Sequence, residues 1–180
     1  MKIIVLDRDG VINRDSDDYI KSAEELVPIN GSIEAIAKLS NAGFTVTVAT
    51  NQSGLARGLF DEEKLSEMHH LLCSMVEAAG GSIDGIFYCP HHPDDGCACR
   101  KPKTGLLEQI EREFGCRLKG CYFVGDSLKD IQAARAFECQ PILVRTGKGQ
   151  ITEQALLQEG VNDVRVFDSL ADAVPSILGT

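Results

Sequence analysis

Two aspartates two residues apart, Asp7 and Asp9, directly follow a short apolar run near the start of the chain. That run, Ile3 to Leu6, is continuous, which is typical of a buried strand in a parallel sheet. In extended backbone, side chains at i and i+2 point to the same side, so both carboxylates face one place. Like charges held together are unfavourable unless a cation or a reacting group uses them. The spacing therefore indicates a metal or catalytic site, with a solvated turn as the alternative.

Four further polar residues have a similar position, at or beyond the end of an apolar run. Thr50 and Asn51 follow one run, and Asp126 and Asp130 follow another; the two runs span 44–49 and 121–124. Helical patterns occupy 32–42, 61–79, 104–114 and 128–137. Strands that alternate with helices predict a parallel sheet covered on both faces. Because ligands of such sheets bind at the carboxyl ends of the strands, we expect these side chains to meet at one edge.

Three of the seven cysteines lie in one short loop, residues 89–99. Cys89, His91, Cys97 and Cys99 form a Cys₃His set within this loop. Thiolates with one imidazole favour four-coordinate Zn²⁺, and four protein ligands indicate a structural site. We prefer His91 over His92 because its spacing from Cys89 repeats the spacing of the other two cysteines. A redox pair or unused loop cysteines are the alternative interpretations.

Two cations, Arg100 and Lys101, directly follow the last of these cysteines. A loop fixed by zinc would hold them beside the strand ends, where they would serve as an anion clamp and not as an exposed basic pair. Arginine suits bidentate phosphate recognition and lysine supplies a point charge. The Thr50 hydroxyl, the backbone amides around Asn51 and Lys101 would then stabilise phosphoryl oxygens.

The carboxylates complete the chemistry of a phosphatase. Asp7 would attack a phosphoryl group and carry it as an aspartyl-phosphate. Asp9 would protonate the leaving oxygen and then activate water. Oxygen ligands favour Mg²⁺, which Asp7 and Asp126 would hold. Asp130 would orient Asp126 or metal-bound water from outside the coordination shell.

Four motifs in this order resemble the haloacid-dehalogenase-like phosphohydrolases over nearly the whole chain. The motifs are Asp7-x-Asp9-Gly10, Thr50, Lys101 and Gly125-Asp126-x-x-x-Asp130. The resemblance implies a Rossmann-like three-layer α/β sandwich with a mainly parallel sheet, as one domain over residues 1–180 that carries the zinc loop. It also implies that the backbone carbonyl of Asp9 ligates Mg²⁺. The spacing between motifs leaves no room for a cap domain, so we expect a capless enzyme.

Within that family, the zinc loop running into Arg-Lys-Pro and the segment 50–58 resemble sugar-bisphosphate phosphatases. These enzymes remove the C7 phosphate of a heptose 1,7-bisphosphate in lipopolysaccharide core assembly. The resemblance implies a small-molecule sugar bisphosphate as partner, catalytic Mg²⁺ and structural Zn²⁺. The expected substrate contacts are Asp15, Tyr19, Asn51, Gln52, Ser53, Arg57 and Arg100. The second phosphate of such a substrate would also explain why an acidic chain holds Arg57, Arg100 and Lys103 near the opening of one site.

Two other functions are compatible with parts of the pattern. A histidinol-phosphate phosphatase has a similar zinc loop, and the run Asp15-Ser16-Asp17-Asp18 could bind its amine, but Ala56-Arg57-Gly58 favours the sugar bisphosphate. A non-catalytic phospho-ligand-binding protein has no use for a nucleophile together with an acid/base. The first activity therefore remains our prediction.

Composition narrows the class of protein. With 180 residues, 43% hydrophobic and 25% charged, the chain is typical of one globular domain. No apolar run is long enough for a membrane span or a signal peptide, so we expect a cytoplasmic protein. A monomer is the default expectation for its oligomeric state. A net charge of −9 argues against a nucleic-acid partner. Gly147-Lys148-Gly149 lacks the spacing of a phosphate-binding loop and predicts a surface turn.

Overall fold

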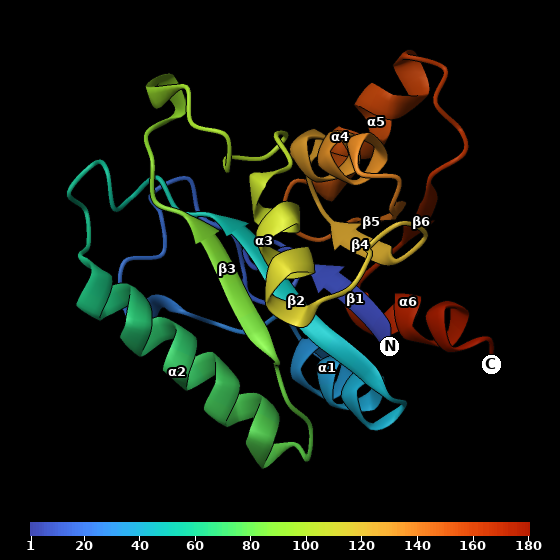
Figure 1. The fold of residues 1–180 in the computed structure, drawn as a ribbon, viewed down its shortest axis with the longest axis horizontal. Helices are drawn as coiled ribbons and strands as arrows, with labels where there is room; N and C mark the ends of the chain where they lie inside the picture. The colour runs from blue at the N-terminus through green and yellow to red at the C-terminus, as the bar shows by residue number, and fades with distance from the viewer.

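The computed structural model describes residues 1–180 and shows a six-stranded parallel sheet between two layers of helices (Figure 1). The strand order is β3-β2-β1-β4-β5-β6, and every neighbouring pair is parallel. The strands are β1 (Lys2–Leu6), β2 (Phe44–Asn51), β3 (Gly85–Cys89), β4 (Tyr122–Gly125), β5 (Gln140–Val144) and β6 (Arg165–Phe167). The helices are α1 (Ser32–Asn41), α2 (Glu62–Ala78), α3 (Gly105–Phe114), α4 (Leu128–Ala136), α5 (Gly149–Gln158) and α6 (Leu170–Leu178), with short 3₁₀ turns η1 (Ala23–Glu25) and η2 (Pro93–Asp95).

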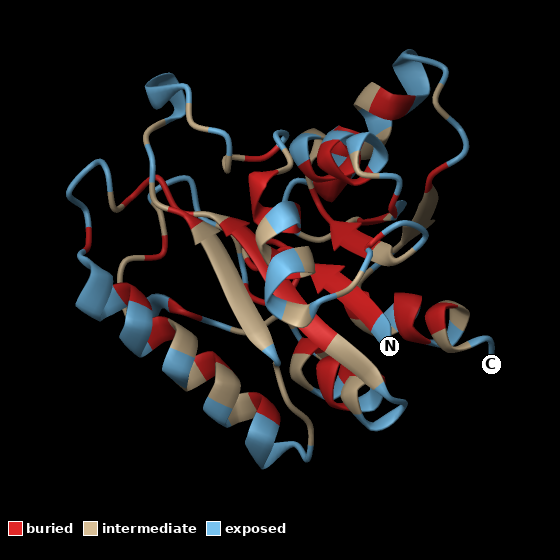
Figure 2. Ribbon diagram, in the orientation of Figure 1, coloured by how far each residue is buried: buried red, intermediate tan, exposed pale blue.

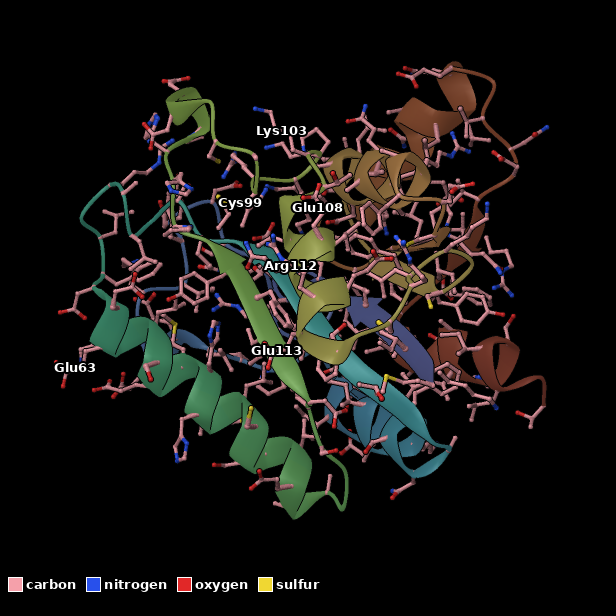
Figure 3. The ribbon with its side chains drawn as sticks, viewed as in Figure 1. Glu63, Cys99, Lys103, Glu108, Arg112 and Glu113 are labelled. Atoms are coloured by element: carbon pink, nitrogen blue, oxygen red, sulfur yellow. The ribbon has the colours of Figure 1, made fainter.

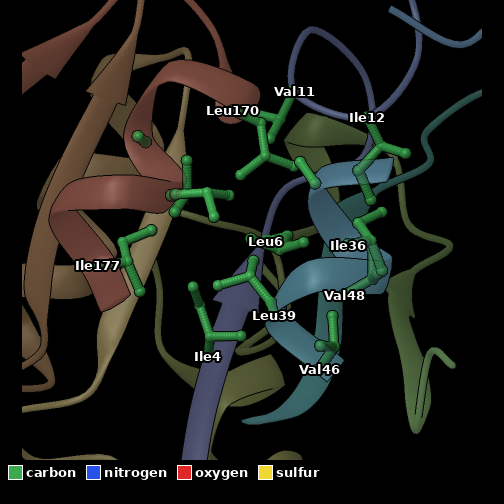
Figure 4. Packing of buried hydrophobic residues seen from close by; sticks show 14 of the residues in the cluster. Ile4, Leu6, Val11, Ile12, Ile36, Leu39, Val46, Val48, Leu170 and Ile177 are labelled. Carbon is green, nitrogen blue, oxygen red and sulfur yellow. The ribbon is translucent and has the colours of Figure 1, made fainter. Parts of the chain in front are cut away.

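Strand β1 is buried on both faces, which explains its continuous apolar sequence. Ile4 and Leu6 pack with residues of α1, α2 and α6 on one side of the sheet (Figure 4). Ile3 and Val5 pack with residues of α3 and α4 on the other side. The inner strands are accordingly almost entirely buried, whereas the helices expose their outer faces (Figure 2). Alternate side chains of one strand thus supply both halves of the core.

The register of β1 brings the polar residues together. Leu6 lies opposite Val48 on β2 and opposite Val124 on β4. The residues that follow these three positions therefore lie at the same edge of the sheet, with Asp7 and Asp126 just beyond β1 and β4 and Thr50 near the end of β2. This is the physical reason why motifs that are far apart in the sequence converge at one edge.

The predicted fold class, a three-layer α/β sandwich with a parallel sheet, is confirmed. The three predicted strands and four predicted helices are present, with ends displaced by one or two residues. The sequence analysis gave no bounds for β3, β5, β6, α5 or α6. None of the helices combines the length and the apolar character needed to cross a membrane.

Candidate active site

A cavity of about 1140 Å³ opens at the carboxyl ends of the strands. Only five of its 25 lining residues are hydrophobic, which suits a polar, charged ligand. The catalytic candidates Asp7, Asp9, Thr50, Lys101 and Asp126 all line it. The sequence therefore predicted correctly that these side chains lie together, while the role of each stays a prediction.

Asp7 and Lys101 form a buried ion pair at the floor of this cavity. The Lys101 ammonium lies 2.9 Å from Asp7 Oδ1 and also donates to the Ala49 carbonyl at 2.7 Å. The backbone amide of Arg8 donates to the same Asp7 oxygen at 2.7 Å. Burial raises the pKa of Asp7 well above its usual value, the neighbouring carboxylates raise it further, and Lys101 lowers it. Both donors contact Oδ1, so Oδ2 has no protein donor and is free to react.

Asp126 and Asp130 place two more carboxyl groups beside Asp7. Ligand atoms of the three aspartates lie within 4.8 Å of one another, and all three residues are buried. Burial and then the charge of Asp130 raise the pKa of Asp126 to about 7. Three buried carboxyl groups around one lysine leave excess negative charge, which a divalent cation would offset. Their oxygen-only donor set fits Mg²⁺.

Asp130 is occupied by protein donors, in keeping with an orienting role. Its Oδ1 accepts from the Lys101 ammonium at 2.7 Å. Its Oδ2 accepts from the amides of Asp126 and Ser127 at 3.2 and 3.1 Å, at the start of α4. These bonds fix the turn that carries Asp126. Asp130 thus joins the lysine to the backbone of the predicted metal ligand.

The segment 146–152 completes the surroundings of Asp126. Lys148 donates its backbone amide to Asp126 Oδ2 at 2.8 Å, and Thr152 donates its hydroxyl to the Asp126 carbonyl at 2.8 Å. Gly10 and Gly147 both have positive φ, and a Cβ on either would collide with the Asp126 carboxylate. The predicted surface turn at 147–149 is therefore also a wall of the active site. The sequence did not indicate this role, because segment 147–149 lacks the spacing of a phosphate-binding loop.

Asp9 is held by donors on both carboxylate oxygens. Oδ1 accepts from Asn13 Nδ2 at 2.8 Å and from Arg8 Nη2 at 2.8 Å, and Oδ2 accepts from Gln52 Nε2 at 3.0 Å. Burial alone would raise the pKa of Asp9, but the Arg8 charge and these hydrogen bonds bring it below its usual value. Sequence analysis did not identify Arg8 or Asn13 as part of the site. Their partners became apparent only from the fold.

The end of β2 supplies the next contacts. The Thr50 hydroxyl lies in the buried floor and accepts from Gln52 Nε2 at 2.9 Å. The Asn51 side chain makes two hydrogen bonds to the backbone of Lys101, with its Nδ2 on the carbonyl at 3.1 Å and its Oδ1 on the amide at 3.0 Å. Asn51 therefore fixes the position of Lys101, and its side-chain amide is already occupied by this contact.

The Cys₃His loop brings four potential zinc ligands together. The ligand atoms of Cys89, His91, Cys97 and Cys99 lie within 4.8 Å of one another. Cys89 Sγ is 3.6 Å from Cys97 Sγ, and His91 Nδ1 is 3.2 Å from Cys99 Sγ. A Zn–S bond of about 2.3 Å in a tetrahedron implies sulfur separations of about 3.8 Å, close to the first value. His92 instead accepts from the Asp94 amide and caps η2, so His91 is the histidine of the cluster.

Replacing Cys97 and Cys99 together by serine should release zinc and lower both stability and activity. Lys101 lies two residues beyond Cys99, so disorder in the loop would displace the ammonium from Asp7. Elemental analysis and thermal unfolding measure the first two effects, and phosphate release measures the third. The variant Cys73→Ser is the control, because Cys73 lies on α2 outside the cluster. Unchanged zinc content in the double variant would contradict the site.

The predicted substrate contacts divide into two groups. Asp15, Tyr19, Asn51, Gln52, Ser53 and Arg100 line the cavity. Arg57 does not: its guanidinium lies over the Tyr19 ring, 5.8 Å from the centroid. Lys103 also points elsewhere and donates to the Cys97 carbonyl at 2.8 Å, beside the zinc loop (Figure 3). Arg57 and Lys103 therefore do not line the cavity, although Tyr19 beside Arg57 does, and the expected role of Arg57 in substrate binding stays a prediction.

Several cationic side chains do line the cavity wall. Arg14, Lys129 and Lys148 line it together with Arg100 and Lys101. Arg100 Nη1 is buried and has no hydrogen-bond partner in the protein. A buried guanidinium nitrogen without an acceptor is unfavourable, which indicates an anionic ligand at this position. The sequence around Arg14, Lys129 and Lys148 did not predict that they would lie at the cavity, because their position depends on how the loops fold.

Comparison with known proteins agrees with this geometry. A family model described as "HAD-hyrolase-like" matches residues 98–173. The D-glycero-beta-D-manno-heptose-1,7-bisphosphate 7-phosphatase of Pseudomonas aeruginosa is 56% identical over 176 residues, which cover 98% of this chain and 97% of the relative. The enzyme of the same name from Bordetella bronchiseptica is 50% identical over 99% of this chain and 98% of its own length.

Two solved structures are similar over their full length. The D,D-heptose 1,7-bisphosphate phosphatase of B. bronchiseptica, complexed with magnesium and phosphate, superposes with a TM-score of 0.93 at 49% identity, covering 99% of both chains. The D,D-heptose 1,7-bisphosphate phosphatase of Burkholderia thailandensis superposes with a TM-score of 0.77 at 39% identity, covering 100% of both. These likenesses extend over nearly the whole chain.

Proposed function

Because this chain belongs to the D-glycero-beta-D-manno-heptose-1,7-bisphosphate 7-phosphatase family of haloacid-dehalogenase-like hydrolases, we propose that its cavity hydrolyses the C7 phosphate of that sugar bisphosphate through an aspartyl-phosphate on Asp7. The observation that carries the mechanism is the buried Asp7–Lys101 pair beside Asp126. Mg²⁺ is the catalytic cation and Zn²⁺ the structural one. The product, a heptose 1-phosphate, suits activation to a nucleotide sugar for lipopolysaccharide core assembly.

The first step transfers the phosphoryl group to the enzyme. Asp7 Oδ2 forms a bond to phosphorus while the bond from phosphorus to O7 of the sugar breaks. The departing oxygen takes a proton from Asp9, which must bind that proton beside the substrate's phosphate before the step, because its pKa is lowered in the free protein. The Thr50 hydroxyl and the Lys101 ammonium donate to the phosphoryl oxygens as charge shifts onto them. A divalent cation on Asp7, the Asp9 carbonyl and Asp126 would reduce the repulsion between the two anions.

The second step releases phosphate. Asp9, now a carboxylate, removes a proton from water as the water oxygen bonds to phosphorus. The bond from phosphorus to Asp7 breaks and restores the free carboxylate. Asp130 and Asn51 keep Lys101 in place throughout, because they bind its ammonium and its backbone. Asp9 therefore serves as the acid in the first step and as the base in the second.

The remaining features of the enzyme follow as parts of the same proposal. Residues 1–180 form one catalytic domain without a cap, and the loops at 15–19 and 52–57 and the zinc loop select the substrate. The β anomer in the name of the relatives is the preferred one. The enzyme acts as a cytoplasmic monomer and has no nucleic-acid partner, in line with its charge of −9.

The test is phosphate release in the presence of Mg²⁺ from both anomers of heptose 1,7-bisphosphate and from histidinol phosphate at equal concentration. We expect fastest turnover of the β anomer, stopping after one phosphate, with the anomeric phosphate retained. Preference for histidinol phosphate would contradict the substrate assignment. Release of both phosphates would contradict the assignment to C7.

The variant Arg100→Ala should lower kcat/KM for the bisphosphate by about tenfold or more, since hydrogen bonds to charged groups are of that size. Its effect on the corresponding heptose 7-phosphate should be smaller, because that substrate lacks the second phosphate. Lys103→Ala is the control, as this nearby cation does not line the cavity. Equal losses on both substrates would mean that Arg100 does not recognise the second phosphate.

A further inference from the structure

Arg8, between the two catalytic aspartates, is the largest fully buried side chain in the protein. Its guanidinium makes one ion pair, to Asp9, with Nε and Nη2 at 3.1 and 2.8 Å from Oδ1. A buried guanidinium needs acceptors for its other donors. The third contact of Arg8 is to a histidine that lies outside every motif of the family resemblance.

That histidine is His69, in the middle of α2. Its Nε2 lies 3.2 Å from Arg8 Nη1. Arginine is only ever a donor, so Nε2 accepts the hydrogen bond and the ring proton lies on Nδ1. Burial, and then the positive charge of Arg8, lower the pKa of His69 to about 3, so the ring remains a neutral acceptor at physiological pH. The Tyr88 ring on β3, with centroids 6.0 Å apart, lies against the histidine.

A chain of contacts thus runs from α2 to the cavity. The His69 ring fixes one end of the guanidinium, and the other two nitrogens of that guanidinium hold Asp9 Oδ1. Asn13 and Gln52 supply the remaining donors to Asp9, but their side chains make no hydrogen bond to the Arg8 guanidinium; Asn13 contacts Arg8 only through the backbone. The guanidinium is therefore oriented by His69 on one side and by Asp9 on the other. Removal of His69 leaves Arg8 Nη1 buried without its acceptor and free to reorient.

We propose that His69 is a positioning residue for the phosphatase reaction: it anchors Arg8, which holds the carboxylate of Asp9 at the place from which a proton reaches the leaving oxygen. The inference deepens the proposed function and rests on the acid role of Asp9. His69 does not contact the substrate and exchanges no proton. Its effect is confined to steps in which Asp9 must be correctly placed.

Leaving-group dependence distinguishes this role from simple packing. A sugar alkoxide is a poor leaving group and requires protonation, whereas p-nitrophenolate leaves without it. The parameter kcat/KM covers substrate binding and the steps up to the aspartyl-phosphate, so it includes the acid step and excludes the later hydrolysis. The substrates are heptose 1,7-bisphosphate and p-nitrophenyl phosphate.

His69→Leu should lower kcat/KM for the heptose bisphosphate by about tenfold or more, a part of the total contribution of a general acid. The loss on p-nitrophenyl phosphate should be several times smaller. His69→Gln, which keeps an acceptor at similar reach, should recover most of the lost rate, whereas the shorter His69→Asn should not. His70→Leu is the matched control, because His70 is the next residue on α2 and is exposed.

Equal losses on the two substrates, with glutamine no better than asparagine, would overturn the inference and leave His69 as a packing residue. If His69→Leu does not fold, the comparison of glutamine with asparagine decides the matter alone. Asp9→Asn is the reference for the underlying mechanism. Absence of leaving-group dependence in Asp9→Asn would reject the acid role of Asp9 itself, whatever the His69 variants do.

Discussion

Replacing Asp7 by asparagine should abolish phosphate release, with a loss of at least about 10⁴-fold in kcat, because the residue supplies the nucleophile itself. The fold and the zinc content should remain intact. The raised pKa of Asp7 indicates that its negative charge is unfavourable in this buried cluster. A neutral amide of the same shape relieves repulsion from Asp126 and Asp130, although Lys101 loses one of its two carboxylate partners.

The covalent intermediate provides an independent check of this prediction. Borohydride reduces an acyl phosphate to an alcohol, so wild-type enzyme quenched during turnover should carry homoserine at position 7 in its N-terminal peptide. Asp7→Asn should show no such product by mass spectrometry. Retained phosphate release in this variant, or reduction at another aspartate, would remove Asp7 as the nucleophile.

The second large effect is expected from Lys101→Met. Lys101 is 2% exposed and lies 2.9 and 2.7 Å from carboxylate oxygens of Asp7 and Asp130. Removing one partner from a buried ion pair costs about 3–5 kcal/mol of folding free energy, because the other charge stays buried. Activity should fall by about 10³-fold or more, since the variant lacks a donor to the phosphoryl oxygens. The pKa of Asp7 should also rise further.

A double-mutant cycle separates the ion pair from the other effects of the substitution. Lys101→Met combined with Asp130→Asn should lose less free energy of unfolding than the sum of the single variants, by about 1–3 kcal/mol. Lys119→Met is the control, because its ion pair with Glu138 is exposed and should contribute less than about 1 kcal/mol. Additive losses in denaturant unfolding would show that Lys101 and Asp130 are not coupled.

The sequence alone predicted those site residues whose positions depend on the pattern of neighbouring residues. Short apolar runs require burial, and Asp7, Thr50 and Asp126 follow or end such runs. The parallel register then brings them together without further information. The zinc ligands were predictable for the same kind of reason, since the spacing of Cys89, His91 and the two later cysteines is local.

Contacts between distant segments could not be predicted in this way. Arg8 occupies the unspecified position of the Asp7-x-Asp9 motif. Only the packing of α2 reveals that His69 accepts a hydrogen bond from its guanidinium. Lys148 lies in an unremarkable glycine-containing turn, and its amide contributes to the site through the path of the loop after β5. Arg57 is a further example, since the sequence did not indicate that its guanidinium lies over the Tyr19 ring and does not line the cavity.

The contacts of segment 146–152 determine when the active site can form during synthesis of the chain. The Thr146 hydroxyl donates to the Gly10 carbonyl across a separation of 136 residues. Such long-range closure is slow relative to local folding. A nascent chain that has emerged only as far as β5 carries its nucleophile but lacks the donors around Asp126. Hydrolytic competence thus requires synthesis beyond residue 152, and we expect N-terminal fragments that end at β5 to have no phosphatase activity.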